Sequence, residues 1–543
     1  MGRRVKLPGQ RRGSARAHLW LAVAAGVAGG VVWLPLGLAP LAPLFGFLYA
    51  RALRCASGGR QALAVGFWCG LARYAVGGHP ILWLTRLSPL AVAFYAVAVL
   101  YIVPSSLLEA WGGYWLERRT GFPRGLGTAL LFTLLGHLRT FGDLSLPADR
   151  VAHAFGGSPG WLEATAYGGP ALIALAASLS GALLEEAWHR RRARRLSAML
   201  ASAGAVLWIA LPATAGALKR LEPPAGAAIR VGIVQPSVPV QDKIDPRRAA
   251  AHWPELRRLT REAAAGTDLV VWPETARPGR VMWEWPGPFR DPEMEAVARE
   301  AGVPILYGCE IVRIDRARRL VHLFNGASVA WPDGRRSDWY GKQRLLPLAE
   351  GFPFARYLGL DPAKRHRTPG RHSLLTMLGN FTPGPRPTVF AVGPARIGVL
   401  ICYEGLYAQL ARAYRRAGAN VLAVITNDAW WGHSVFPLWH ARVVAARAQE
   451  LGVPVIRAAN NGISSLTDRE GRMLARTRLD EVTVLRGNLR LGGPPFGAFF
   501  RWGDLSAAAA GLALAVLAGW AAFGPRRRSH ASGAARRGSV QSP

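Results

Sequence analysis

The hydrophobic pattern divides the chain into regions of two kinds. Long apolar runs crowd the amino-terminal part and recur once near the carboxyl end. Most of them approach the ~20 residues that an α-helix needs to cross a bilayer. The pattern predicts membrane spans at 17–36, 37–53, 62–84, 88–112, 125–138, 166–185, 197–217 and 505–523. Residues 1–217 are therefore interpreted as a membrane domain of about seven transmembrane helices, and 505–523 as a separate C-terminal transmembrane helix.

The region between these parts has a different pattern, in which short β-type runs alternate with helix-type stretches. Pieces such as DLVVWPE and NVLAVITND are short and apolar, as buried strands are. Helix-type stretches lie near 247–265, 292–301, 405–417 and 437–451. Apolar strands separated by helices are typical of a layered α/β domain, which we predict over 228–490. A β-rich insert around 321–340 predicts some antiparallel pairing.

The distribution of basic residues adds an orientation to this picture. A formal net charge of +34 is typical of proteins that bind nucleic acid, but here the arginines cluster in alternate loops between the predicted spans. One set of loops and termini holds clusters at 3–16, 51–60, 118–124, 190–195 and 526–537, whereas the short opposite loops hold only Arg86, Arg139 and Arg150. Because basic loops stay in the cytoplasm, we predict a cytoplasmic amino terminus, an outer α/β domain and a basic cytoplasmic tail at 524–543. No nucleic-acid partner is expected.

The cysteines are few, at positions 55, 69, 309 and 402. This number is far below that of a disulfide scaffold, and no Cys/His spacing resembles a zinc site. We therefore expect neither a metal nor a cofactor.

Three motifs place a reactive residue directly after a β-type run, where α/β folds expose functional side chains. They are VVWPE with Glu274, YGKQRLLPLAE with Lys342 and Glu350, and VLICYEG with Cys402, Tyr403 and Glu404. Taken alone, each has an ordinary explanation, since a cysteine after VLI is usually a small core residue, and a glutamate or a lysine suits a helix start or a solvated loop. Taken together, they supply a thiol nucleophile, a base for its proton and a cation for an oxyanion. The combination predicts a site for acyl chemistry.

In this order the motifs resemble those of the nitrilase superfamily, and with the membrane flanks they are most similar to the apolipoprotein N-acyltransferases, also called lipoprotein N-acyltransferases. The segment 425–465 adds further similarity through Asn427, Asp428, Trp430, Gly432, Ser434, His440, Arg447, Glu450, Arg457, Asn460 and Gly462. The resemblance implies an αββα sandwich with Cys402 as nucleophile, Glu274 as base and Lys342 as oxyanion donor. It gives supporting roles to Glu350, Tyr403 and Glu404.

The resemblance also implies a reaction and its partners. A fatty acyl group moves from a phospholipid, with phosphatidylethanolamine as the expected donor, through a Cys402 thioester to the N-terminal α-amine of diacylglyceryl-cysteine in apolipoproteins. The protein is expected to be a monomeric, multi-pass protein of the bacterial inner membrane, with its catalytic domain on the periplasmic side. Neither a cofactor nor a metal is implied.

The chain departs from the family pattern in places. Lys243 is followed by Ile244 instead of tryptophan, LLPLAE stands for LVPFGE, Trp439 replaces a common glutamine, and the outer loop 139–165 matches weakly. These changes bear on lipid preference more than on reaction type. Two other functions remain open: a membrane-anchored nitrilase-type amidase and an acyltransferase with another amine acceptor. A transporter is disfavoured because the spans contain few ionisable residues besides Arg73 and His79.

Overall fold

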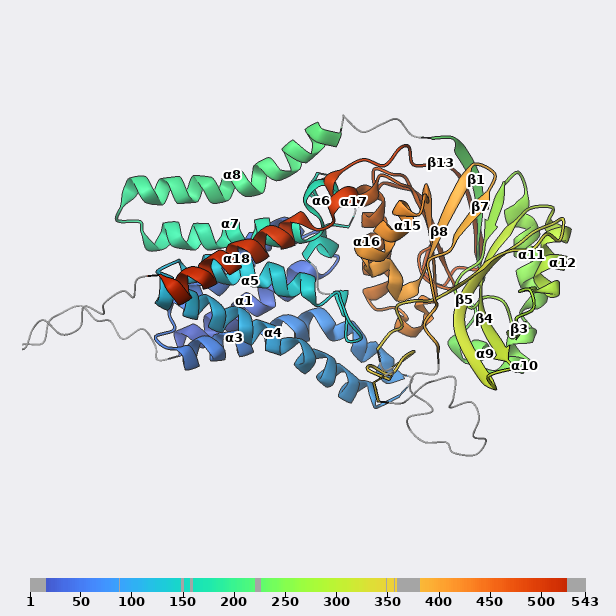
Figure 1. The fold of residues 1–543 in the computed structure, drawn as a ribbon, viewed down its shortest axis with the longest axis horizontal. Coiled ribbons are helices and arrows are strands. Elements are labelled where there is room, and N and C mark those ends of the chain that lie inside the picture. Colours follow the sequence, from blue (N-terminus) through green and yellow to red (C-terminus); the bar gives the residue numbers. More distant parts are fainter. Residues whose placement is uncertain are drawn as a thin grey trace, which may run out of the picture.

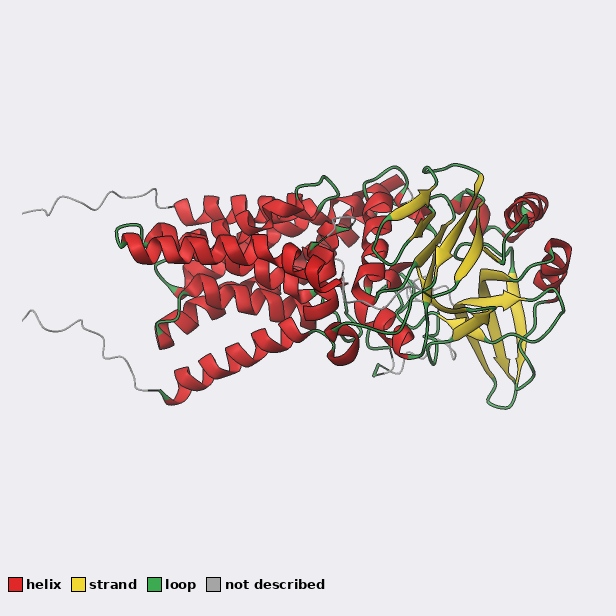
Figure 2. Ribbon diagram, turned by 90° about the horizontal axis from the view of Figure 1, so that it is seen from above, coloured by secondary structure: helices red, strands yellow, loops and turns green. Residues whose placement is uncertain are grey.

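The molecule has two parts that lie end to end. The computed structural model describes residues 16–86, 88–147, 151–156, 160–219, 226–347, 349–355, 357–358 and 381–524. Within them, a bundle of helices and an α/β domain follow one another along the longest axis (Figure 1). Figure 2 shows the same division from above, with strands at one end only. The predicted basic tail lies outside the described residues except for Gly524.

The bundle has a helix at each predicted span. Its long helices are α1 (Ala17–Trp33), α2 (Ala42–Arg54), α3 (Gly59–Gly78), α4 (Ala91–Thr120), α5 (Arg124–Leu138), α7 (Ala171–His189), α8 (Arg194–Lys219) and α18 (Leu505–Phe523). Its short elements are η1 (Ala39–Leu41), η2 (His79–Arg86), η4 (Val151–Phe155), α6 (Trp161–Gly168) and α17 (Ala498–Trp502). Among the described residues, α4, α7, α8 and α18 are long and apolar enough to cross a membrane. The other helices are shorter or less apolar, so the number of spans stays a prediction.

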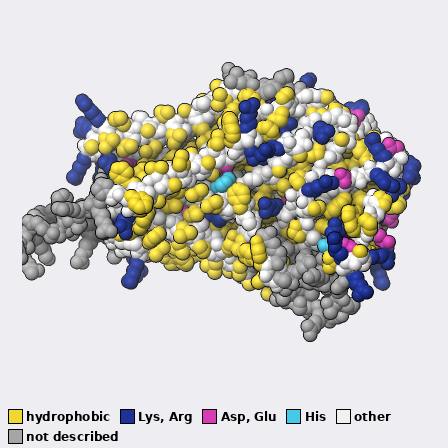
Figure 3. Space-filling view, in the orientation of Figure 1, with side chains coloured by type: hydrophobic (Ala, Val, Ile, Leu, Met, Phe, Trp, Pro, Cys, Tyr) yellow, Lys and Arg dark blue, Asp and Glu magenta, His cyan; other side chains and the backbone are white. Residues whose placement is uncertain are grey.

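Small residues let the bundle helices approach closely. A Cβ atom added to Gly66 of α3 would overlap the carbonyl oxygen of Ser106 in α4, which is typical of helix contacts inside a membrane. Large apolar side chains face outward instead, among them Val206 and Ile209 of α8. Figure 3 shows hydrophobic side chains along the flank of the bundle. This surface suits a lipid environment better than water.

Two sheets form the α/β domain. The strand order is β13-β1-β2-β4-β5-β6 in the first sheet, with β3 beside β4, and β12-β11-β10-β9-β8-β7 in the second. The strands are β1 (Ala228–Gln235), β2 (Leu269–Val271), β3 (Arg280–Trp285), β4 (Ile305–Asp315), β5 (Leu320–Ala330), β6 (Trp339–Gly341), β7 (Val389–Val392), β8 (Ala395–Ile401), β9 (Val421–Thr426), β10 (Val455–Ala459), β11 (Ser465–Thr467), β12 (Met473–Arg476) and β13 (Thr483–Arg490). The central strands of each sheet are parallel. Strand β5 pairs antiparallel with β4 and β6, which confirms the predicted antiparallel insert.

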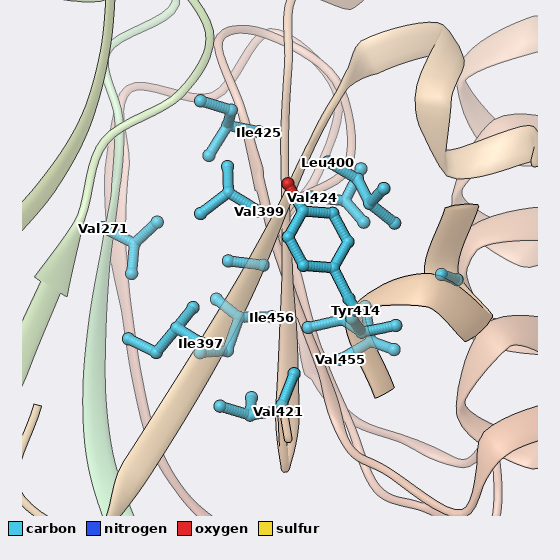
Figure 4. Close-up of a cluster of buried hydrophobic side chains, with 14 of the residues drawn as sticks. Val271, Ile397, Val399, Leu400, Tyr414, Val421, Val424, Ile425, Val455 and Ile456 are labelled. Atoms are coloured by element: carbon cyan, nitrogen blue, oxygen red, sulfur yellow. The ribbon is translucent and has the colours of Figure 1, made fainter. Parts of the chain in front are cut away.

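Helices cover both outer faces of the paired sheets. The helical elements are α9 (Val240–Ile244), α10 (Pro246–Ala250), α11 (Trp253–Ala264), α12 (Pro292–Ala301), η5 (Cys402–Leu406), α15 (Ala408–Arg416), η6 (Asp428–Trp431) and α16 (Phe436–Leu451). Helices α11 and α12 pack on the first sheet and α15 and α16 on the second (Figure 1). Figure 4 shows the core between the sheets, where Val271 of β2 faces Ile397 and Val399 of β8. The layers form an αββα sandwich, so the predicted fold class is confirmed.

Helix α16 joins the two parts of the molecule. One face belongs to the sandwich, and the other contacts the bundle. The Trp439 ring packs against Trp33 of α1 with 4.6 Å between ring centroids, and Arg442 Nη1 donates to the carbonyl oxygen of Pro35 at 2.9 Å. Helix α18 leads away from this junction and ends at the far end of the bundle (Figure 1). The α/β domain is therefore docked at one end of the bundle.

Candidate active site

The residues predicted to react follow strands of both sheets. Glu274 comes soon after β2, Lys342 directly after β6, and Cys402 directly after β8. Glu274 is 6% exposed and Lys342 is 1% exposed, while the Cys402 side chain is half-buried. The structure brings the three together, because the charges of Glu274 and Lys342 both act on the Cys402 thiol.

Lys342 lies between two carboxylates. Its Nζ is 2.7 Å from Glu350 Oε1 and 3.5 Å from Glu274 Oε1. The Asn325 side-chain amide donates to the same two oxygens, at 3.1 Å and 2.8 Å respectively. Burial lowers the pKa of Lys342, but the attraction of Glu350 and Glu274 outweighs it and raises this pKa above its usual value. The lysine therefore stays a cation in a site with little water.

Glu274 is held from more than one side. Its Oε2 accepts the backbone N–H of Asn427 at 2.9 Å. Lys243 Nζ donates to the Glu274 backbone carbonyl at 2.9 Å. Burial lowers the pKa of Lys243 to about 8, against the opposing attraction of Glu274. Glu274 is thus fixed through both its carboxylate and its main chain, which keeps it oriented toward the site.

Cys402 begins η5 in an unusual backbone conformation. Its φ is 51°, in the left-handed region that a residue with a Cβ rarely adopts and that proteins keep mainly at functional turns. Burial and the Glu274 carboxylate raise the pKa of the Cys402 thiol, while Lys342 and a hydrogen bond with Thr426 lower it, and the raising effects win. The resting group is therefore a thiol, which needs a base at the moment of reaction.

Glu404 joins the two halves of the site. It is completely buried, and its Oε1 accepts the backbone N–H groups of Gln343 at 2.7 Å and Arg344 at 3.0 Å. Its Oε2 accepts the Ile401 N–H at 2.9 Å, and Tyr340 Oη donates to the same carboxylate at 2.8 Å. The Glu404 carboxylate, for which a supporting role was expected, thus binds the Lys342 loop to the Cys402 turn.

Tyr403 reaches the bundle. Its Oη donates to the Ser145 carbonyl oxygen at 2.9 Å, and Tyr407 Oη donates to the same oxygen at 3.1 Å. Ser145 follows α5 in the outer loop of the bundle. The residue next to the nucleophile is therefore held by the helical part of the chain.

Three of the remaining family-like residues, Asp428, His440 and Arg457, form a buried polar network beside the Cys402 turn. Arg457 Nη2 is 2.7 Å from Asp428 Oδ2, and His440 Nδ1 is 3.2 Å from Asp428 Oδ1. Burial raises the pKa of Asp428, but Arg457 and His440 outweigh it and lower this pKa below its usual range. Burial also lowers the pKa of His440. These contacts hold the turn after β9 in place.

Two residues of the site had not been singled out from the sequence. Asn325, which bridges Glu274 and Glu350, is a polar residue inside the apolar run LFNGASVA, and that position could have identified it. Thr426 gave no comparable signal, because a β-branched residue is ordinary in a strand. Chemically, the site supplies a thiol, a carboxylate base and a buried cation. Within the described ranges, no group of His, Cys, Asp and Glu side chains could hold a metal ion.

Comparison with known proteins identifies the α/β domain first. Residues 230–493 match the sequence model of the carbon-nitrogen hydrolases. A CN-hydrolase superfamily protein of Xanthomonas campestris with a crystal structure aligns with 48% of this chain and 90% of its own, at 18% identity and a TM-score of 0.35. The sequence match, the αββα sandwich and the Glu–Lys–Cys site together define a carbon-nitrogen hydrolase domain.

Relatives that match nearly the whole chain identify its family more narrowly. The apolipoprotein N-acyltransferase of Geobacter metallireducens is 32% identical over 489 residues, which cover 84% of this chain and 87% of that protein. The apolipoprotein N-acyltransferase of Azotobacter vinelandii is 33% identical over 537 residues, with 95% and 96% covered. The chain belongs to the apolipoprotein N-acyltransferase family.

Proposed function

We propose that this protein transfers a fatty acyl group from a phospholipid, through a Cys402 thioester, to the N-terminal α-amine of diacylglyceryl-cysteine in apolipoproteins. Its membership of the apolipoprotein N-acyltransferase family supports N-acylation of lipoproteins. The observation that carries the mechanism is the cluster in which Lys342 lies between Glu274 and Glu350 beside the Cys402 thiol.

The first half-reaction forms the acyl-enzyme. Glu274 takes the proton of Cys402, and the thiolate attacks the carbonyl carbon of a phospholipid ester. The oxyanion that develops accepts hydrogen bonds from Lys342 and from a backbone N–H that follows Cys402, in a buried site where fixed donors are most effective. The C–O bond then breaks, and the lysophospholipid alkoxide leaves with the proton that Glu274 holds.

The second half-reaction resolves the thioester. The α-amine of the acceptor attacks the thioester carbonyl, and Glu274 accepts the proton that the amine loses. The C–S bond breaks, and the proton returns to the Cys402 sulfur, which restores the resting thiol and releases an amide. Lys342 serves the same oxyanion position in both halves, and Glu350 keeps its ammonium group there.

The contact with the bundle supports a lipid donor. The η6 turn next to the site lies against η2 of the bundle, since a Cβ atom on Gly432 would overlap Trp83 and Arg86. Trp430 in this turn is 41% exposed, and tryptophan favours the membrane–water interface. Each buried CH₂ group of an acyl chain contributes about 0.8 kcal/mol, so a donor that stays in the bilayer suits the site. We propose phosphatidylethanolamine as this donor and a monomer as the active form.

The orientation of the bundle follows from its charges. The turn between α7 and α8 carries exposed arginines, including Arg190, Arg191 and Arg192, at the end of the bundle far from the α/β domain (Figure 1). We propose that this end faces the cytoplasm, as basic loops do. The α/β domain of 228–490 then lies on the periplasmic side of the bacterial inner membrane, with the seven long helices of the first part and α18 as spans.

The proposal is tested with the full-length protein in lipid nanodiscs. A fluorescent phosphatidylethanolamine and a synthetic diacylglyceryl-cysteine peptide serve as substrates, and the N-acylated peptide is measured by chromatography. Cys402→Ser is expected to lower its formation by at least about a thousandfold, as loss of a covalent nucleophile does. Cys309→Ala is the matched control, because Cys309 is a buried thiol in β4 and its loss is expected to leave the reaction intact.

Two results would contradict the proposal. Unchanged amide formation by Cys402→Ser would remove the thioester mechanism. Release of free fatty acid without any amide product would favour the hydrolytic alternative. Mass spectrometry of the intact protein incubated with the lipid alone is expected to show an acyl adduct on Cys402.

A further inference from the structure

Three arginines gather where the α/β domain meets the short helix that precedes α18. Arg412 and Arg416 are four residues apart on α15, and Arg501 belongs to α17. Arg412 Nε donates to the carbonyl oxygen of Phe500 and its Nη2 to that of Arg501, both at 2.9 Å. The side chains of Arg416 and Arg501 are exposed. Figure 3 shows basic side chains on the surface at this junction, and we call the three residues the junction arginines.

The junction arginines lack acidic partners. In the part of the chain that the structure describes, none of them forms an ion pair with an aspartate or a glutamate. Arg258 of α11 shows the usual arrangement, since it lies 2.8 Å from Glu255 and 3.3 Å from Glu262. Arg412 and Arg416 instead repel each other, because like charges four residues apart on a helix are neighbours. Burial lowers the pKa of Arg412, and the charge of Arg416 lowers it further. An anion from outside the chain would relieve this repulsion.

The acidic residue nearest to Arg501 in the sequence is already engaged elsewhere. Asp504 Oδ2 accepts the backbone N–H of Ala171 at 3.0 Å, and its Oδ1 accepts that of Ala507 at 3.3 Å. His137 Nδ1 lies 3.4 Å from the same carboxylate. Asp504 therefore joins helix ends of the bundle, and the junction keeps an excess of positive charge.

The position of the junction indicates which anion it meets. Trp502 follows Arg501 directly and is 68% exposed, and α18, which is long and apolar enough to cross a membrane, begins at Leu505. Tryptophan beside the end of a span is typical of the membrane–water interface, where the phosphate groups of phospholipids lie. Basic residues near span ends usually collect on the cytoplasmic side. The junction lies at the opposite end of the bundle, beside the α/β domain (Figure 1), so its arginines need another explanation.

We propose that the junction arginines bind the phosphate group of an anionic phospholipid in the leaflet next to the α/β domain. A guanidinium group matches phosphate oxygens with parallel N–H donors. Arg416 and Arg501 present exposed guanidinium groups, and Arg412 adds a charge that the α17 carbonyl oxygens hold in place. Trp502 lies at the level of the headgroup. The site is separate from the Cys402 site, so the inference goes beyond the proposed function.

A bound lipid at this place would have a mechanical effect. Helix α15 begins at Ala408, directly after η5, which begins with Cys402. A phosphate that bridges α15 and α17 therefore fastens the helix after the nucleophile turn to the helix that leads into α18. The lipid would hold the α/β domain against the bilayer surface without taking part in the reaction.

The test measures lipid binding apart from acyl transfer. The full-length protein in detergent is mixed with equal amounts of ether-linked phosphatidylglycerol and ether-linked phosphatidylcholine, which carry no ester for Cys402 to attack. Native mass spectrometry then measures the ratio of the two lipid adducts, and the original protein is expected to prefer phosphatidylglycerol. Arg416→Gln combined with Arg501→Gln is expected to lower this preference about tenfold, as loss of two basic residues beside an anionic lipid should.

The matched control removes the same charge at a distant place. Arg247→Gln combined with Arg261→Gln changes two exposed arginines of α10 and α11, at the end of the α/β domain far from the bundle (Figure 1). It is expected to leave the lipid preference unchanged. Arg412→Gln is a second test variant and is expected to lower the preference as well. Because it also loses its bonds to α17, its folding is checked by thermal unfolding, whereas the Arg416 and Arg501 side chains make no such bonds in the described structure.

A competition experiment identifies the source of the phosphate. Inorganic phosphate at the concentration of the lipid is expected to displace little phosphatidylglycerol, since acyl chains add apolar contacts that the free ion lacks. Displacement by inorganic phosphate would overturn the lipid assignment.

Three other outcomes would also overturn the inference. They are an original protein without preference for phosphatidylglycerol, an unchanged preference in the variant of Arg416 and Arg501, and an equal loss of preference in the control variant. Failure of the proposed function would be seen separately, as the absence of an acyl adduct on Cys402 after incubation with an ester-linked phospholipid.

Discussion

Buried cations in the bundle and in the α/β domain are stabilised in different ways. In the bundle, the Arg73 guanidinium lies over three aromatic rings, 5.1 Å from the centroid of Phe45, 5.1 Å from that of Tyr74 and 4.7 Å from that of Phe132. The negative ring faces attract the cation. A ring face carries no formal charge, so this part of the attraction needs no carboxylate.

In the α/β domain, Lys342 lies between the carboxylates of Glu274 and Glu350. A carboxylate can accept a proton. In the proposed mechanism Glu274 takes the Cys402 proton, so one negative charge moves from the carboxylate to the sulfur while Lys342 stays beside both groups. The comparison teaches that aromatic ring faces and carboxylates can both hold a buried cation, and that only the carboxylates also place a proton acceptor beside it.

The largest effect that tests this comparison is expected from Lys342→Met. Loss of the ammonium group removes the proposed oxyanion donor and leaves the buried Glu274 carboxylate and the partly buried Glu350 carboxylate facing each other. We expect kcat/KM for amide formation to fall by about 10²–10³, the range found for removal of an oxyanion donor. Lys342→Arg is the control and is expected to restore little, because a planar guanidinium does not replace a compact ammonium group. Activity of either variant near that of the original protein would contradict the assignment.

A smaller effect, on stability alone, is expected from Arg73→Met. Removal of the guanidinium loses its contacts with the three rings, and we expect the free energy of unfolding to fall by about 1–2 kcal/mol. The change in thermal unfolding of the protein in detergent measures it. Specific activity of the folded fraction is expected to stay within about twofold, because Arg73 holds no reacting group. A fall in kcat as large as that of Lys342→Met would erase the distinction between the two regions.

The smallest effect concerns pH and Lys243. Burial lowers the pKa of Lys243 to about 8, so its positive charge is fully present below pH 8 and is lost as the pH rises through that value. Because the charged ammonium group donates to the Glu274 backbone carbonyl, loss of its charge weakens the bond that orients Glu274, and we expect kcat/KM to fall by about threefold through this range. Lys243→Arg keeps its charge, and the ratio of its activity to that of the original protein is expected to rise with pH. A constant ratio from pH 7 to 9 would mean that Lys243 does not influence the base.

The reactive residues could be predicted from the sequence more completely than the strands of the two sheets that position them. Strands such as β8 and β9 contain apolar runs that lead directly into a reactive or polar residue, so their positions and the convergence of Glu274, Lys342 and Cys402 could be predicted. Strand β13 was not predicted, because its sequence TVLRGNLR is half polar and its partner β1 is distant along the chain. Local patterns contain no information on such a pairing.

Contacts between the helical bundle and the α/β domain also could not be predicted from the sequence. The hydrogen bond from Tyr403 to the Ser145 carbonyl oxygen involves a backbone atom, which any residue at that position would provide. Likewise, Thr426 lies beside Cys402 because the neighbouring parallel strands β8 and β9 end next to each other. Residue types indicate which groups can react, whereas the geometry of the fold decides which neighbours assist them.

The buried Glu404 has a consequence for how the site can move. Its single carboxylate accepts N–H groups from the lysine loop and from the strand that leads to the cysteine, so neither segment can swing outward without breaking bonds to the other. One buried side chain thus ties the sulfur and the ammonium group to a common anchor and presets their relative placement.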